Sequence, residues 1–152
     1  MVTKKYKLVE MILNNYHFLQ DLIEMESEIN NLKSVKYQHT TSQGNYNSDK
    51  TQKAAFEKIE RDEEILKVSV LVDYIEKAIE KLPDLEKRTI KKYYIQQLNW
   101  TTVSQAVHCS IRHCQRKRRN GINILSNLLY FDKTGEYYKI FDKLLADNIL
   151  TR

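Results

Sequence analysis

Residues that interrupt helices are rare in this 152-residue sequence, which contains three glycines and one proline. Tight hairpins depend on such residues at their turns, so an all-α fold is expected. Long hydrophobic runs are also missing, because none approaches the roughly 18 apolar residues that a membrane span needs. The first residues, Met1–Lys5, lead into an amphipathic segment and not into the apolar core of a signal peptide. We therefore expect a cytoplasmic protein without a membrane partner.

Cysteine is scarce as well, with Cys109 and Cys114 as the two examples. A disulfide between them would close a very short loop and add little stability, which favours reduced thiols. Each follows a histidine, His108 or His113, and His and Cys are common zinc ligands. Adjacent helical residues point about 100° apart, so these four side chains converge poorly on one ion. We expect no metal and no cofactor, with both cysteines packed as small core side chains.

Acidic side chains are almost absent between Leu85 and Tyr130, where one glutamate accompanies nine lysines and arginines. This segment therefore has a local net charge of +8. The rest of the chain, with 16 basic and 19 acidic side chains, has a net charge of −3. Such an asymmetry is typical of a protein in which one half faces a polyanion.

Apolar residues recur every three or four positions through most of the chain, which predicts amphipathic helices. The first helix is expected over Lys4–Lys36 and a second over Thr51–Leu82, joined by a polar loop at 37–50. The second helix contains a coiled-coil-like seam of Ile65, Val68, Val72, Ile75 and Ile79. Two partners for this seam remain open: the first helix of the same chain, or the same arm of another subunit in a homo-oligomer.

Pro83 ends the second helix because its ring clashes with the preceding turn, and Asp84 is expected to cap the next helix. That helix is expected over residues 85–98. A short helix should then begin at Thr101 or Thr102 and end at Val107. Two more helices are expected over residues 110–128 and 134–150.

The stretch from Leu82 to Leu129 carries the most specific pattern. It opens with Leu82-Pro83, and the aromatic Trp100-Thr101 begins a short helix. Val103 and Val107 occupy apolar core positions of that helix, and Cys109-Ser110 form a tight turn after it. In these features it resembles the helix-turn-helix of sigma-70 region 4. The resemblance implies a helix-turn-helix DNA-binding domain over 83–130, preceded by a helical arm or hairpin over 1–82 and followed by a C-terminal helix over 131–152.

With its helical arm and overall size, the chain is also similar to phage transcriptional regulators of the RinA/ArpU type, which activate late genes. That resemblance implies a regulator that binds promoter DNA and contacts host RNA polymerase. One position departs from the usual motif: the turn, where glycine is common because φ is positive, has His108. Histidine tolerates this backbone region better than most residues, so the turn stays compatible with the motif.

The residues after the turn indicate DNA binding without the family. Ser110 can cap the following helix and place five residues on its first turns: Ile111, Arg112, His113, Gln115 and Arg116. When the N-terminus of a helix enters the major groove, Arg suits guanine and Gln suits adenine. Cys114 is expected to face inward, with Ile111 and Arg118 one helical turn on either side. Arg112, His113, Arg116 and Arg119 then face outward.

Phosphate contacts position a protein on DNA without reading its sequence. We expect them from basic residues around the base-reading face: Lys87, Arg88, Lys91, Lys92, Lys117 and Arg119. Thr101 and Thr102, at the start of the short helix, complete the predicted DNA surface. A charged face that is merely solvated is the less favoured interpretation.

Catalytic patterns are missing from the sequence. The carboxylates between Glu57 and Glu64 alternate with Lys58, Arg61 and Lys67 at helical spacing, which is typical of a solvated face with ion pairs. We therefore expect no enzymatic activity. The predicted function is a sequence-specific transcriptional regulator. The alternatives are a small terminase subunit, which would bind DNA for packaging, and a protein-interaction module that does not bind DNA.

Overall fold

The computed structural model describes residues 3–36 and 49–128, and residues 136, 137, 139, 140, 142–144 and 146 near the C-terminus. Within these residues the structure contains helices and no strand, which confirms the all-α prediction. None of these helices has both the length and the apolar character that would let it cross a membrane. The predicted loop at 37–50 falls mostly outside the described residues, as does much of the predicted C-terminal helix.

The first predicted helix is divided in two. Helix α1 covers Lys4–Asn14 and helix α2 covers Tyr16–Lys36, so the prediction of one continuous helix over Lys4–Lys36 was wrong. The break lies at Asn15, whose side-chain amide donates to the carbonyl oxygen of Met11 at 2.8 Å. Asparagine disrupts helices in this way because its short amide competes with the backbone for hydrogen bonds.

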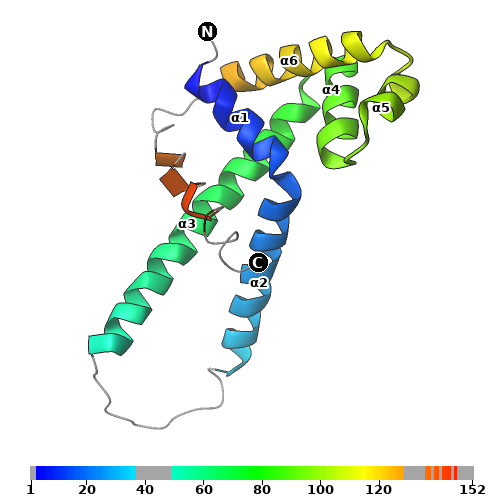
Figure 1. Cartoon of the computed structure of the whole chain (residues 1–152). Helices are drawn as coiled ribbons and strands as arrows, with labels where there is room; N and C mark the ends of the chain where they lie inside the picture. The colour runs from blue at the N-terminus through cyan, green and yellow to red at the C-terminus, as the bar shows by residue number, and fades with distance from the viewer. Residues whose placement is uncertain are drawn as a thin grey trace.

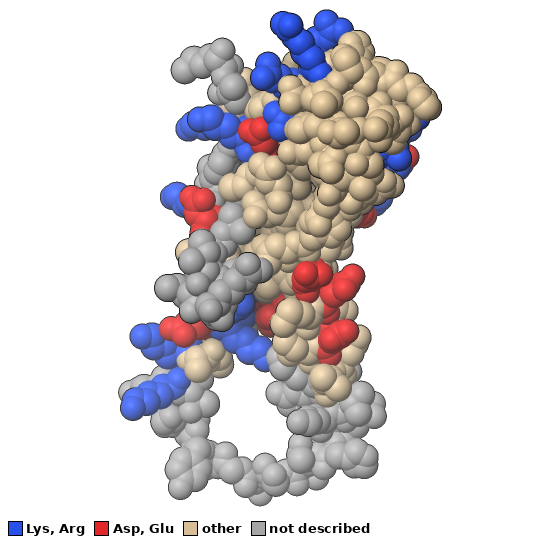
Figure 2. Space-filling view, turned by 45° about the vertical axis from the view of Figure 1, so that its right-hand side comes forward, with Lys and Arg blue, Asp and Glu red and all other residues tan. Residues whose placement is uncertain are grey.

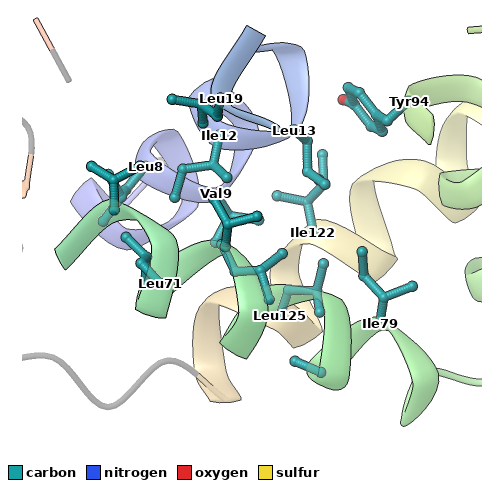
Figure 3. Close-up of a cluster of buried hydrophobic side chains, with 14 of the residues drawn as sticks. Leu8, Val9, Ile12, Leu13, Leu19, Leu71, Ile79, Tyr94, Ile122 and Leu125 are labelled. Atoms are coloured by element: carbon teal, nitrogen blue, oxygen red, sulfur yellow. The ribbon is translucent and has the colours of Figure 1, made fainter. Parts of the chain in front are cut away.

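Helix α3, Asp49–Glu80, carries the predicted seam, and all five seam residues are buried. They share one core with residues of α1 and α2, so the seam is covered within the chain. The side chains of this core that Figure 3 labels come from α1, α2, α3 and the later helices, namely Leu8, Val9, Ile12, Leu13, Leu19, Leu71, Ile79, Tyr94, Ile122 and Leu125. The C-terminal residues Ile140 and Leu144 are buried in the same core.

Beyond Pro83 the chain forms α4 (Asp84–Ile90), a π-helical segment η1 (Lys91–Ile95), α5 (Trp100–Val107) and α6 (Ile111–Leu128). The helix predicted over residues 85–98 therefore becomes π-helical after Ile90 and ends at Ile95. Gln97 has a positive φ of 53°, which a continuing helix does not allow. The predicted Asp84 cap was also wrong, because Pro83 is the N-cap of α4. Helix α5 begins at Trp100 and not at Thr101 or Thr102, and Asn99, whose side chain accepts from the backbone N–H of Thr102, caps it.

Figure 1 shows α6 crossing the end of the molecule above α1 and α3, while α2 and α3 diverge as they run away from α4–α6. Ile90 of α4 and Ile122 and Leu125 of α6 belong to the core of α1–α3, so this core crosses the boundary predicted after Leu82. The other buried cluster joins Val103 and Val107 of α5 with further residues of the α4–α6 region. The α4–α6 region is thus anchored on the arm.

Candidate nucleic-acid interface

Three residues connect α5 to α6. The first, His108, has a left-handed backbone with φ 57° and ψ 41°, as predicted from its position in the motif. The following N–H, of Cys109, donates to the carbonyl oxygen of Ser104 at 3.0 Å and closes the end of α5. The third, Ser110, accepts from the backbone N–H of His113 at 3.3 Å and caps α6, as predicted.

The inner side of this helix pair is apolar. Val103, Val107 and Cys114 form a buried cluster against which Leu85, Leu98, Trp100 and Cys109 pack. The inward position of Cys114 is confirmed, because its side chain is fully buried. This burial raises the pKa of its thiol. The aromatic entry is held by Trp100, which stacks on Tyr93 with ring centroids 4.1 Å apart. The described residues bring together no group of three or more His, Cys, Asp and Glu side chains suited to a metal ion.

The outer side of α6 is polar and basic. A hollow of about 480 Å³ is lined by six of the predicted DNA-binding residues, Ser110, Arg112, His113, Gln115, Arg116 and Arg119. Within it, Arg116 Nη2 lies 2.8 Å from His113 Nδ1, so the two side chains form one unit when that nitrogen accepts. No acidic residue occurs in α6. In Figure 2, Lys and Arg side chains project from the end of the molecule where α6 lies.

Lys117, a predicted phosphate contact, has an intramolecular role. Its Nζ lies 2.9 Å from Oε1 of Glu86 on α4, and the side-chain amide of Asn120 donates to the same oxygen at 2.9 Å. Burial would raise the pKa of Glu86, but the hydrogen bonds from Lys117 and Asn120 outweigh it and lower that pKa. The carboxylate therefore stays charged and braces α6 against α4.

Arg118 forms a second brace. Its Nη1 donates to the Tyr94 hydroxyl at 3.2 Å, and its Nη2 lies 3.7 Å from a carboxylate oxygen of Glu10 on α1. Burial raises the pKa of Tyr94 to about 12, although Arg118 acts in the opposite direction. Arg118 thus points back toward the neighbouring helices. Ile111, on the first turn of α6, is 41% exposed.

The remaining predicted residues lie away from the α6 hollow. Lys91 pairs with Glu80 of α3 and lines a different depression together with Tyr16 and Gln96. Lys92 is half-buried in η1. Thr101 and Thr102 are exposed on the first turn of α5, where the Thr102 hydroxyl donates to the Asn99 side chain at 3.0 Å. Arg88 is half-buried and donates to the carbonyl oxygen of Ala106 at 3.1 Å, which ties α4 to α5.

Close packing of α6 on α4 depends on Gly121, which no local pattern in the sequence marks. A Cβ atom at this position would lie 2.5 Å from Cδ1 of Ile90. Glu86 was also missed. It stood out only as the single acid among nine basic residues, and its distance of 31 positions from Lys117 gave no local signal.

A comparison with protein families matches this chain to one family. The family model described as "Protein of unknown function (DUF722)" matches residues 5–127. The chain belongs to the DUF722 family. The matched residues run from α1 to the penultimate residue of α6, so the DUF722 unit includes both the arm and the basic face of α6. Neither a curated protein nor a solved structure matches the chain.

Proposed function

We propose that this DUF722 protein is a sequence-specific DNA-binding transcriptional regulator that reads the major groove with the outer face of α6. The observation that carries the proposal is the grouping of Arg112, Gln115, Arg116 and Arg119 around one hollow on a helix without acidic residues. Arg and Gln are the side chains that form paired hydrogen bonds with guanine and adenine edges. The proposal involves no catalytic step and places the protein in the cytoplasm with its DNA.

The way α6 is held supports this use of its outer face. Lys117 and Arg118 point back to Glu86, Tyr94 and Glu10, so the helix is fixed from behind by charged contacts. A recognition helix has to be rigid, because a base contact loses its discrimination when the side chain can shift. The residues left on the outside then face the groove.

The proposed biological role is activation of phage late genes together with host RNA polymerase. Its support is the resemblance of the Leu82–Leu129 region to sigma-70 region 4 and of the whole chain to RinA/ArpU-type regulators. Phosphate contacts would come from basic side chains that remain accessible near the hollow, of which Arg119 is the most exposed candidate.

Selection of genomic DNA fragments on the purified protein, followed by footprinting, tests this proposal. We expect a protected site upstream of a promoter. Arg112→Ala and Arg116→Ala should reduce the enrichment, whereas Lys58→Ala, which removes one charge from the exposed surface of α3, should retain it. Enrichment of a packaging origin would instead support a small terminase subunit, and absence of salt-dependent binding would exclude DNA as the partner.

A further inference from the structure

Helix α3 has a second apolar row in addition to its buried seam. The row consists of Phe56, Ile59, Leu66 and Val70, whose side chains are 72%, 55%, 65% and 59% exposed. At 100° per residue, Val70 lies about 160° around the helix from the buried Val72. The described core therefore leaves this row uncovered.

The spacing of the row is that of a helix–helix contact. From Phe56 the steps are three, seven and four residues, and Glu63 occupies the position between Ile59 and Leu66. Alternating steps of three and four are typical of a coiled-coil seam. An exposed apolar strip of this length on a helix marks an interaction surface.

The charges of α3 indicate which kind of partner fits. The helix contains nine acidic and six basic side chains, so it offers nothing to a polyanion such as DNA or to an anionic membrane. Side chains of both signs are interspersed along it, which suits a partner with the same pattern. We propose that the partner is a second copy of this chain, whose α3 packs antiparallel on the exposed row.

The antiparallel direction follows from Glu63. In a parallel pair each Glu63 would face its own copy at the centre of the contact, and two like charges would repel each other. In an antiparallel pair centred midway between residues 63 and 66, Ile59 faces Val70 of the second copy. Leu66 then faces the aliphatic part of Glu63 of the second copy. The same register brings Glu60 beside Lys67 of the second copy on each side of the two-fold axis. Lys67, whose side chain is 48% exposed, contacts Glu136 of its own chain at 2.9 Å and can donate to a second carboxylate.

The extent of the contact predicts a reversible dimer. From Phe56 to Asp73 the paired helices would be in contact over about 27 Å, at 1.5 Å per residue. A contact between single helices of this length is at the small end of specific interfaces. Dissociation on dilution through the micromolar range is therefore expected.

A consequence for DNA binding rests on the proposed function. Glu80, at the end of α3, would lie about 23 Å from the two-fold axis, so the α4–α6 regions of the two copies would start about 46 Å apart. That distance exceeds the roughly 34–36 Å of one turn of DNA. Two half-sites bound by one dimer should be inverted and more than one turn apart.

Sedimentation equilibrium over a range of protein concentrations tests the dimer independently of DNA. We expect the mass to rise from the 18.1 kDa of one chain toward twice that value. Ile59→Lys and Val70→Lys should remain monomeric at the highest concentration, with unchanged far-UV circular dichroism because both side chains are exposed. Met25→Lys, which alters a 60% exposed side chain on α2, is the matched control and should still dimerise. A wild-type chain that stays monomeric, or variants that dimerise as it does, would overturn the proposal.

Disulfide cross-linking tests the direction. In the antiparallel register Ile59→Cys and Val70→Cys should cross-link only when the two variants are mixed. The wild-type chain is the control for cross-links through its own cysteines, Cys109 and Cys114. Cross-linking of either variant with itself would contradict the antiparallel arrangement. Failure of DNA binding alone would leave both results unchanged, so the dimer and the proposed function can fail separately.

Discussion

Glu86 of α4 and Lys117 of α6 form an ion pair of 2.9 Å in which the glutamate side chain is only 4% exposed. A buried carboxylate that loses its charge leaves the lysine ammonium without a counter-charge, which is costly. Glu86→Gln should therefore lower the free energy of unfolding by about 1–3 kcal/mol in chemical denaturation. Glu80→Gln is the control. It alters an exposed pair with Lys91 and should cost clearly less, because solvent screens exposed charges. Equal losses in the two variants would argue against the brace.

The same carboxylate should make stability depend on acid pH. The pKa of Glu86 is lowered in the folded protein from its ordinary value of 4.5. Its contribution is therefore complete above that ordinary value and is lost as the pH falls through the lower pKa of the folded state. The free energy of unfolding, measured from pH 7 downward, should fall less steeply in Glu86→Gln than in the wild type below about pH 4.5. Parallel curves would show that Glu86 is not held as a charged group.

Gly121 should be required for the approach of α6 to α4. Alanine favours helices by about 1 kcal/mol over glycine, but its Cβ would clash with Ile90, whose side chain is fully buried. Gly121→Ala should thus destabilise the protein by about 1–3 kcal/mol. Ile90→Val removes the clashing methyl group, so adding Gly121→Ala in that background should cost clearly less. A double-mutant cycle by thermal denaturation measures this, and strictly additive effects would exclude the contact.

The turn between α5 and α6 predicts a stabilising substitution. A non-glycine residue in the left-handed region costs about 1–2 kcal/mol, and His108 has a φ of 57°. His108→Gly should raise the melting temperature, and His108→Val should lower it because β-branched side chains fit this region worst. The opposite order would mean that the His108 side chain stabilises the turn by contacts of its own.

Local patterns in the sequence were enough to predict the all-α fold and the Ser110 cap of α6. The buried seam on α3, the Ser110 cap and the inward Cys114 depend on spacing within one or two helical turns. The positive φ at His108 was expected from the resemblance to the helix-turn-helix motif. The hollow that joins Arg112, Gln115 and Arg116 also comes from one face of one helix.

Contacts between distant segments could not be predicted in this way. Lys117 looked like another exposed cation because its partner, Glu86, comes 31 positions earlier. The break at Asn15 was hidden for a different reason. The apolar period continues across it, while the backbone leaves the helix at Asn15, with φ −108° and ψ 17°, where the side-chain amide donates to Met11.

Titration of a selected site and of scrambled DNA at several salt concentrations shows whether α6 reads DNA sequence. Arg112→Ala and Arg116→Ala should each reduce the preference for the selected site by about 1–3 kcal/mol. Arg119→Ala, at the edge of the hollow, is predicted to weaken both DNAs alike and to lower the salt slope by about one unit. Lys58→Ala on α3 should change neither. If Arg112→Ala and Arg116→Ala weakened both DNAs equally, α6 would not be the helix that reads the sequence.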